Sequence, residues 1–469
     1  MNLNFEKIQK DFADFTHTLN NVRGRKLISF FFKLEYFNPL LLVDKINQNF
    51  DDVFIFTSPN NKRTFIGINS AVELINEYAE NFSDALNQYA YWKNNCLSNE
   101  DEISRPIDTA ICCWAKFDPS KTHFIWKDFN SLRIYIPELI FSIHENEVNA
   151  YFNFCCENES NLNSKINDLT NYLMVLFSEK SRTPDSSRKE ISVDIEQNKI
   201  QLKSWNDNVI KALEALKNEP LQKIVLSRAH NFFLNAEINW DELLQKLYGR
   251  FPDCYLFFLK KNSSIFFGSS PEMFLKVKDR TAEVESVAGS APRGEKTESD
   301  YEMEKFLRSS EKNHQEHLLV SDFISDILIK YSNDVRIIEE KQIRKLDNIQ
   351  HLITKISAVL NSKENLFELI DSLFPTPAVC GVPKDYSMNL IRELENHDRG
   401  LYSGLVGVLD FYGNCELAVS IRSALVKGNQ VIAFAGAGLL KNSNPEEELL
   451  ETELKLNPIL SLFENESKS

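Results

Sequence analysis

The chain has 469 residues, a formal net charge of −15 and 43% hydrophobic residues, which is the composition of a soluble globular enzyme with a large core. It contains no lysine or arginine run, so nucleic acid and anionic membrane are excluded as main partners. No apolar run approaches the ~20 residues that span a bilayer, and the N-terminus has no apolar leader. The eight cysteines form no CxxC pair, which predicts free thiols in a cytoplasmic protein.

Helices and strands are mixed along the first part of the chain. A helix is predicted over 5–19, a strand over 28–35 and a hairpin over 53–68 with Ser-Pro-Asn-Asn as its turn. The segments LRIYIPELIFSI and EVNAYFNFCC predict two further strands, and a helix is expected over 162–177. The polar segment 179–189, EKSRTPDSSRK, is the best candidate for a linker.

The second part of the chain repeats part of the first. ELLQKLYGRFPDCYLFFLKKNSSIFFGSS resembles LLLVDKINQNFDDVFIFTSPNNKRTFIGIN, since both run helix, aromatic strand, polar turn, aromatic strand. This weak internal duplication predicts two related layers packed together. Without strict alternation of strand and helix, an α+β fold is favoured over a doubly wound one. We divide the chain into an N-terminal α/β portion, 1–195, and a catalytic portion, 196–465, as parts of one intertwined domain.

Two residues of the second portion are candidates for acid–base chemistry. Lys223 opens the apolar run KIVL, and on a strand it would share a face with Val225 and Ser227. A lysine that faces a closed site can lose its proton and act as a base; a strand-edge lysine that reaches water is the alternative. Glu272 follows an aromatic strand, where burial can keep a carboxyl protonated. The alternative is a first-turn helix glutamate.

A third carboxylate lies in an apolar helical stripe. In the helix predicted around SEKNHQEHLLVSDFISDIL, Glu316 shares a face with Val320, Phe323 and Ile327. A carboxylate in that position needs a cation, a hydrogen-bond network or a metal as its partner. The histidines beside it lack zinc-site spacing, so zinc is not expected.

The C-terminal segment NSNPEEELLETELK predicts a helix capped by Asn444. Glu448, Glu451 and Lys455 then lie on one face of it. With Glu316, these carboxylates offer the hard oxygen ligands that Mg²⁺ prefers, and Lys455 can meet a substrate carboxylate beside the metal. The alternative is a set of first-turn acids that only complement the helix dipole.

Arg422, in the strand-like run ELAVSIRSALV, is hard to explain as a surface residue. Bidentate binding of a substrate carboxylate and a core salt bridge are the two interpretations. The other candidate pocket residues, each with an ordinary structural alternative, are Gly289, Ser290, His351, Thr376 and Tyr402.

Taken together, the motifs of residues 200–460 resemble the chorismate-binding enzyme family. KIVLSR, GSSPE, AGS-PRG, KN-QEH, NIQHL, PTPAVCG, YSGLVG, IRSA and GAGLL-S-PEEE--ET--K all occur in the family's order. The resemblance is weaker in residues 1–200, where WKDFNSLRIYIPELIF carries most of it. It implies a large layered sandwich of β-sheet and helices.

The resemblance also implies roles for the candidate residues. Lys223 would activate water to attack C2 of chorismate, and Glu272 would protonate the departing C4 hydroxyl. Glu316 and Glu451 would bind Mg²⁺, with Glu448 assisting. The residues implied to contact the substrate are Gly289, Ser290, His351, Thr376, Tyr402, Arg422, Gly436, Gly438 and Lys455.

Within the family, the residues favour isochorismate synthase. Lys223 indicates water as the nucleophile, and Ala288 stands where aminodeoxychorismate synthases carry a lysine. Neither a glutaminase segment nor a glutaminase partner is therefore expected. A salicylate synthase and a non-catalytic chorismate-binding relative stay open, as does the downstream use of the product in menaquinone, siderophore or salicylate synthesis. Phe374 replaces the usual histidine, and Ser290 replaces threonine but keeps its hydroxyl.

Overall fold

The computed structural model describes residues 4–19, 23–99, 110–121, 123–157, 162–177, 191–193 and 195–463. Its strands are β1 (Lys26–Leu34), β2 (Asp52–Thr57), β3 (Thr64–Glu73), β4 (Cys96–Ser98), β5 (Ile111–Ala115), β6 (Leu132–His144), β7 (Glu147–Cys156), β8 (Ile191–Val193), β9 (Lys223–Leu234), β10 (Tyr255–Lys261), β11 (Ser264–Ser270), β12 (Met273–Lys278), β13 (Thr281–Pro292), β14 (Ser332–Lys345), β15 (Ile349–Leu360), β16 (Gly381–Val382), β17 (Leu405–Leu409), β18 (Cys415–Val419), β19 (Ser423–Lys427) and β20 (Gln430–Leu439).

Its α-helices are α1 (Phe5–Thr18), α2 (Val43–Asn49), α3 (Leu86–Asn94), α4 (Leu162–Phe177), α5 (Ile195–Ala215), α6 (Trp240–Arg250), α7 (Thr297–Ser309), α8 (Glu311–Tyr331), α9 (Leu366–Leu373), α10 (Lys384–Leu394) and α11 (Pro445–Leu460). None of the helices in these described segments combines the length and the apolar character needed to cross a bilayer. The helices predicted over 5–19 and 162–177 are confirmed as α1 and α4. The predicted linker 179–189 lies outside the described residues.

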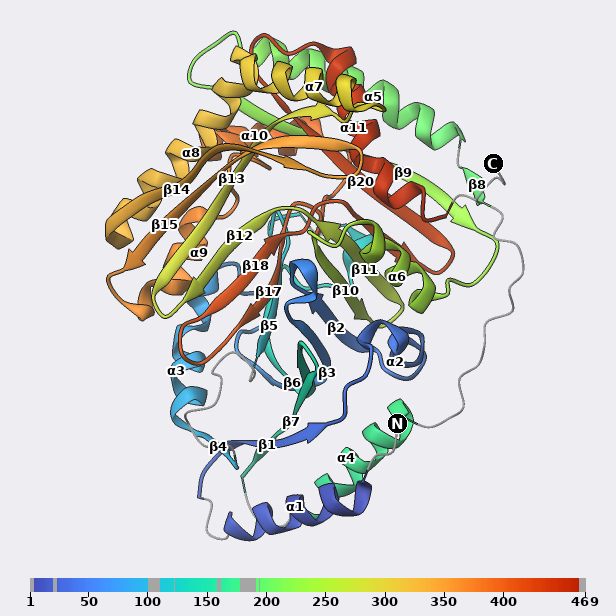
Figure 1. Cartoon of the computed structure of the whole chain (residues 1–469), viewed down its shortest axis with the longest axis vertical. Helices are drawn as coiled ribbons and strands as arrows, with labels where there is room; N and C mark the ends of the chain where they lie inside the picture. The colour runs from blue at the N-terminus through green and yellow to red at the C-terminus, as the bar shows by residue number, and fades with distance from the viewer. Residues whose placement is uncertain are drawn as a thin grey trace.

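One hydrogen-bonded sheet runs through the described chain and folds back on itself (Figure 1). From β6, one arm continues through β3, β2, β10, β11, β19 and β20 to β9, and the other through β5, β17, β18, β12, β13 and β15 to β14. The strand pairs are antiparallel apart from β1 with β4, among those that the structure describes. The two arms bring strands from both portions of the chain into the same sheet.

The interior of the folded sheet is aromatic and comes from both arms. Its buried cluster includes Phe56, Trp114, Phe257, Phe266 and Phe434. Two other clusters lie between the strands and the surrounding helices, with α1, α2, α4, α6 and α11 contributing to one and α3, α5, α8, α9 and α10 to the other. The architecture is therefore the predicted α+β sandwich with helices outside.

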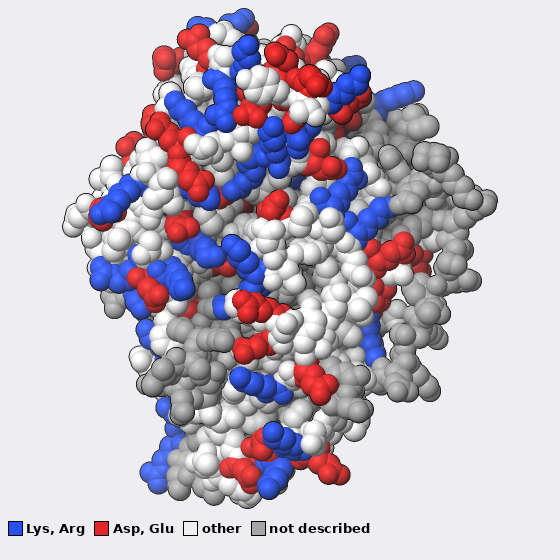
Figure 2. Space-filling model, viewed as in Figure 1, with Lys and Arg blue, Asp and Glu red and all other residues white. Residues whose placement is uncertain are grey.

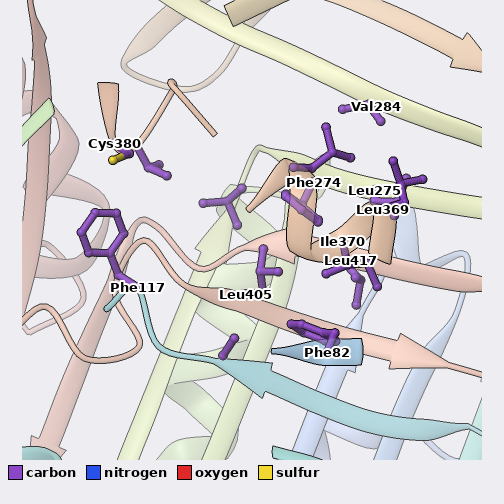
Figure 3. Close-up of a cluster of buried hydrophobic side chains, with 14 of the residues drawn as sticks. Phe82, Phe117, Phe274, Leu275, Val284, Leu369, Ile370, Cys380, Leu405 and Leu417 are labelled. Atoms are coloured by element: carbon purple, nitrogen blue, oxygen red, sulfur yellow. The ribbon is translucent and has the colours of Figure 1, made fainter. Parts of the chain in front are cut away.

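Figure 3 shows part of the second helix-covered cluster. Phe274 and Leu275 on β12 and Leu417 on β18 pack with Leu369 and Ile370 of α9. These side chains are buried and apolar, so this packing fixes β12, the strand that follows Glu272, together with its neighbour β18. The eight cysteines are free thiols, as predicted.

The predicted internal duplication is visible as two α–β–β units. The first is α2 with β2 and β3, and the second is α6 with β10 and β11. Strands β2 and β10 pair with each other, so the two units lie side by side. Their helix starts also bond reciprocally: the Trp240 amide donates to Asp44 at 2.8 Å, and the Asp44 amide donates to Asp241 at 2.9 Å.

Candidate active site

A pocket lies where β9 and β20, from one arm, meet β13 and β15, from the other, beside α8 and α11. Of the predicted site residues, its wall contains Glu272, Gly289, Ser290, Glu316, His351, Tyr402, Arg422, Gly436, Gly438, Glu451 and Lys455. Lys223, Thr376 and Glu448 lie outside this lining. Residues that are far apart in the sequence are thus brought together by the closure of the sheet.

Lys223 is the first residue of β9 and is fully buried. Its Nζ forms an ion pair with Glu316 Oε1 of α8 at 3.0 Å. Gly438 on β20 leaves room for this pair, because a Cβ at that position would lie 2.3 Å from Glu316 Oε1 and 3.1 Å from Lys223 Cε. Glu316 lies in the apolar stripe of α8 and was expected to need a partner for its charge. That partner is a buried lysine, Lys223, at the edge of the pocket.

Glu272 occupies the short link between β11 and β12, not the first turn of a helix. Its amide donates to Ser270 Oγ at 3.2 Å, and its carbonyl accepts from the Val419 amide at 3.1 Å. Burial raises the pKa of the Glu272 carboxyl to about 7, with Glu285 adding to the rise and Lys223 opposing it. The site therefore holds a carboxyl that is able to donate a proton near neutral pH.

The strand-like run ELAVSIRSALV forms two strands, β18 and β19, and Arg422 is buried in the turn between them. The backbone of Arg422 has φ 51°, a left-handed conformation that ends one strand before the next begins. Its carbonyl accepts from the Ser269 amide at 3.1 Å, which helps to hold this conformation. In the described part of the chain, no carboxylate lies within ion-pair distance of Arg422, so the core-salt-bridge alternative has no partner there.

A short hydrogen-bond chain links Arg422 to the opposite wall. Arg422 Nη2 lies 3.3 Å from His351 Nε2, and His351 Nδ1 lies 2.9 Å from Ser290 Oγ. Burial and the nearby Arg422 charge hold the pKa of His351 well below its usual value, so the ring is neutral. Since Arg422 can only donate, Nε2 accepts and Nδ1–H donates to Ser290. The Ser290 hydroxyl hydrogen is thereby left for another acceptor.

The wall formed by β20 presents backbone and an aromatic ring. Tyr402 stacks on Phe434, with ring centroids 5.3 Å apart, and burial raises its pKa to about 12. A Cβ at Gly436 would lie 3.1 Å from the Tyr402 hydroxyl. Lys455 Nζ donates to the Gly436 carbonyl at 3.0 Å and contacts Glu451 Oε1 at 2.5 Å. Tyr402, Arg422 and Lys455 therefore face one side of the pocket.

Each of the three predicted metal ligands contacts a lysine. Glu316 pairs with Lys223, Glu451 with Lys455, and Glu448 with Lys312 at 2.5 Å. Burial, and then the charge of Glu451, raise the pKa of Glu448 to about 7.

These carboxylates fit a divalent cation in donor type and charge, because hard oxygens crowded together are stabilised by a cation. In the described residues they do not converge into a ready-made ligand cluster, and the three ammonium groups supply the positive charge.

One face of the molecule is not uniformly acidic despite the net charge of −15. Figure 2 shows Lys and Arg side chains interspersed with Asp and Glu, with several gathered in the upper centre of the face. Within the pocket, Arg422 and Lys455 supply cationic groups. The lining also contains Glu272, Glu316 and Glu451, so an anionic group is favoured only beside Arg422 and Lys455.

A family model described as a chorismate binding enzyme matches residues 14–464. The chain belongs to the chorismate-binding enzyme family.

Individual members differ in how much of the chain they match. The anthranilate synthase component 1 of Saccharolobus solfataricus is 33% identical over 272 residues, which cover 58% of this chain and 64% of that protein. The isochorismate synthase MenF of Bacillus subtilis is 25% identical over 467 residues, or 98% of each chain. The structure of MenF, the menaquinone-specific isochorismate synthase from Escherichia coli, has a TM-score of 0.77 at 21% identity and covers 97% of this chain and 100% of that one; this likeness shows the fold.

The two departures from the motifs of the chorismate-binding family have local explanations. Phe374 packs edge-on against Phe274, with ring centroids 6.1 Å apart, so an apolar ring suits this position. Ser290 keeps the hydroxyl contact with His351. Thr376 is buried beside Phe374, and in the described structure its Oγ1 has no hydrogen-bond partner.

Three further residues near the site were not predicted. Lys312 lies one helical turn before Glu316, and this i, i+4 spacing was a readable signal. The buried Glu285 and the partly buried Arg344 form an ion pair beside Glu272. Neither the alternation of polar and apolar residues in β13 nor the polar sequence of β14 distinguishes these two residues from surface charges. Their pairing depends on how the sheet bends.

Proposed function

We propose that this protein is an isochorismate synthase, which converts chorismate to isochorismate. Water adds at C2 of the ring, the ring double bonds shift, and the C4 hydroxyl departs as water. The reaction needs one group that takes a proton and another that gives one. The observation that carries the proposal is the buried pair of candidates, with Glu272 in the wall of the pocket and Lys223 at its edge.

Lys223 is the proposed base. In its neutral form it takes a proton from the attacking water as the C2–O bond forms. Lys223 forms an ion pair with Glu316, so we propose that Glu316 exchanges this partner for another cation during turnover. Glu272, protonated near pH 7, gives its proton to the C4 oxygen as the C4–O bond breaks.

The other pocket residues are proposed to position the substrate. Arg422 binds the enolpyruvyl carboxylate through its planar guanidinium, with Tyr402 and the backbone at Gly436 beside it. Lys455 assists at a substrate carboxylate, and the hydroxyl of Ser290 donates toward the ring substituents. Because no carboxylate among the described residues lies within ion-pair distance of the buried Arg422, an anionic ligand is proposed to supply the partner that it lacks.

Mg²⁺ is the proposed cofactor, held by Glu316 and Glu451 with help from Glu448. When bound, it would neutralise these carboxylates and hold the ring carboxylate of chorismate. The lysines that pair with the carboxylates would then be free to face the substrate.

The test is a product assay with purified protein, chorismate and Mg²⁺, but no amine. We expect isochorismate to accumulate until an equilibrium with chorismate is reached, and turnover to stop after exhaustive EDTA treatment. Continued conversion to salicylate and pyruvate would move the assignment to a salicylate synthase. Turnover that requires ammonia would assign an anthranilate synthase-like reaction. Binding of chorismate without turnover would identify a non-catalytic relative.

A further inference from the structure

Arg344 and Glu285 enclose the backbone of Glu272. Arg344 Nη1 donates to the Pro271 carbonyl at 2.6 Å and to Glu285 Oε2 at 2.8 Å, and its Nη2 donates to Glu285 Oε1 at 2.7 Å. On the other side of Glu272, the Met273 amide lies 3.5 Å from Glu285 Oε2. One ion pair therefore contacts the peptide groups immediately before and after the proposed acid.

The pair joins strands that are not neighbours. Glu285 is on β13 and Arg344 is on β14, and β15 lies between these strands in the sheet. Glu285 is 7% exposed, so its charge is desolvated and the bidentate contact with Arg344 compensates for this. If Arg344 served only to stabilise the edge strand β14, it would not need to contact the link between β11 and β12 that carries Glu272.

Groups of opposite charge act on the Glu272 carboxyl. Burial and Glu285 favour its protonated form, while Lys223, Lys455 and Arg344 favour its carboxylate. Arg422, from the turn between β18 and β19, also interacts electrostatically with the Glu272 carboxylate. Glu285 is thus the carboxylate that offsets several cations facing the same group.

We propose that Glu285 and Arg344 are positioning residues for this reaction: the pair clamps the backbone on both sides of Glu272 and keeps one fixed negative charge beside its carboxyl. This inference rests on the proposed function. It assigns two separable roles, because the charge belongs to Glu285 and the grip on Pro271 belongs to Arg344.

Glu285→Gln tests the charge. Glutamine keeps the shape and one acceptor oxygen, but loss of the negative charge favours deprotonation of Glu272. We expect the alkaline limb of the profile of kcat/KM against pH, which follows loss of the Glu272 proton, to move to lower pH by about one unit. The double variant Glu285→Gln/Arg344→Gln restores the charge balance, so its profile should return to the wild-type position while kcat stays low.

Arg344→Lys tests the grip. Lysine keeps the positive charge but loses the fork that reaches Pro271 and Glu285 together. We expect kcat to fall about tenfold, with the KM for chorismate and the position of the pH profile unchanged. Asp118→Asn is the matched control for Glu285→Gln. It also removes a carboxylate from a bidentate pair, in this case with Arg392, outside the pocket lining.

A Glu285→Gln profile that coincides with wild type and with Asp118→Asn would overturn the charge role. An unchanged kcat in Arg344→Lys would overturn the grip. If Glu285→Gln does not fold, the double variant is compared with Arg344→Gln, from which it differs only in the charge at residue 285; coincident pH profiles of these two variants would overturn the charge role. The profiles follow loss of chorismate, so they can be compared even if wild-type protein makes a product other than isochorismate, a result that would remove only the proposed function.

Discussion

Two buried arginines of this protein have opposite surroundings. Arg133, on β6, donates to both oxygens of Asp52 at 2.7 Å, contacts Glu73 at 2.6 Å and lies 3.7 Å from the centre of the Tyr135 ring. Burial alone would raise the pKa of Asp52, but Arg133 overrides it and the pKa is lowered. Arg422 is equally buried, but its described side-chain contact is a neutral histidine, and burial lowers its pKa.

The difference separates a structural charge from a binding charge. The Arg133 group is already satisfied by its own carboxylates, so a ligand would gain nothing there. Arg422 has paid its desolvation cost without a compensating anion, and a substrate carboxylate would recover it. The balance of partners, more than burial itself, is what supports the proposal that Arg422 binds substrate.

The largest effect should come from removing the proposed acid or base. We expect Lys223→Ala and Glu272→Ala each to lower turnover by about 10²–10⁴-fold, with circular dichroism spectra that match wild type. The two losses should not add, since both groups act in one displacement. Full activity in either variant, measured as chorismate consumed, would remove that residue from the mechanism.

Breaking the ion-pair cluster of Arg133 with Asp52 and Glu73, here called the Arg133 cluster, should lower the stability of the fold. Arg133→Met leaves Asp52 buried without its bidentate partner, so we expect the free energy of unfolding to fall by about 3–5 kcal/mol. Urea titration gives this value. The folded fraction should bind chorismate as wild type does. A stability loss below 1 kcal/mol would show that the Arg133 cluster is not the structural counterpart argued above.

The buried carboxyl of Glu272 should lower the free energy of unfolding by an amount that depends on pH. Its pKa is raised from 4.5 to about 7, so the folded protein binds the proton more tightly than the unfolded chain does. The free energy of unfolding therefore falls as pH rises from 4.5 to 7, and the full cost applies above pH 7. Glu272→Gln should remove this cost, roughly 3 kcal/mol at pH 8, since each pH unit between the two pKa values is worth about 1.4 kcal/mol.

Thermal melts of wild type and Glu272→Gln should converge near pH 4.5 and separate toward pH 8, with the variant melting higher. Parallel melting curves at all pH values would contradict a raised pKa. The Arg133 cluster predicts the reverse trend, because the lowered pKa of Asp52 stabilises the fold above its unfolded value and the benefit is lost in acid.

Much of this could be predicted from sequence because the signals were local. Asn444 accepts from the Glu446 amide and α11 begins at Pro445, so the capping signal placed Glu448, Glu451 and Lys455 correctly on a helix. Lys223 opens β9 as its apolar run indicated. The helix–strand–strand repeat gave the layered plan.

What could not be predicted depends on long-range geometry. The left-handed φ of Arg422 follows from the junction of β18 with β19 and from a bond to Ser269, neither of which its strand-forming neighbours encode. The contact between Glu285 and Arg344 requires the bend of β13, where the register with β15 shifts between Ala288 and Ser290. Such pairs are properties of the folded sheet.

Arg422→Lys sharpens the comparison of the two arginines. An ammonium is a point charge and cannot replace a planar fork, so we expect the KM for chorismate to rise about thirty-fold. The free energy of unfolding should stay within 0.5 kcal/mol of wild type, in contrast to Arg133→Met. An unchanged KM together with a large stability loss would place Arg422 in the structural class.

The smallest predicted effect concerns the lysines that pair with the proposed metal ligands. Lys312 Nζ lies 2.5 Å from Glu448 Oε1, and the charges of Glu316 and Glu451 also reach it. A divalent cation bound by these carboxylates would have to overcome repulsion from this ammonium. Lys312→Gln should therefore tighten Mg²⁺ binding, by about tenfold because the lysine is partly exposed and screened.

Calorimetric titration of Mg²⁺ into substrate-free protein measures this directly. Lys330→Gln, an exposed lysine on the same helix, controls for the change in net charge, and Lys312→Arg should bind Mg²⁺ as wild type does. Lys261→Gln is a control from the Arg133 cluster, because Lys261 also pairs with Asp52. In that variant Asp52 remains paired with Arg133, so no Mg²⁺ affinity should arise there. Equal or weaker Mg²⁺ binding by Lys312→Gln would mean that Lys312 organises the carboxylates instead of competing for them.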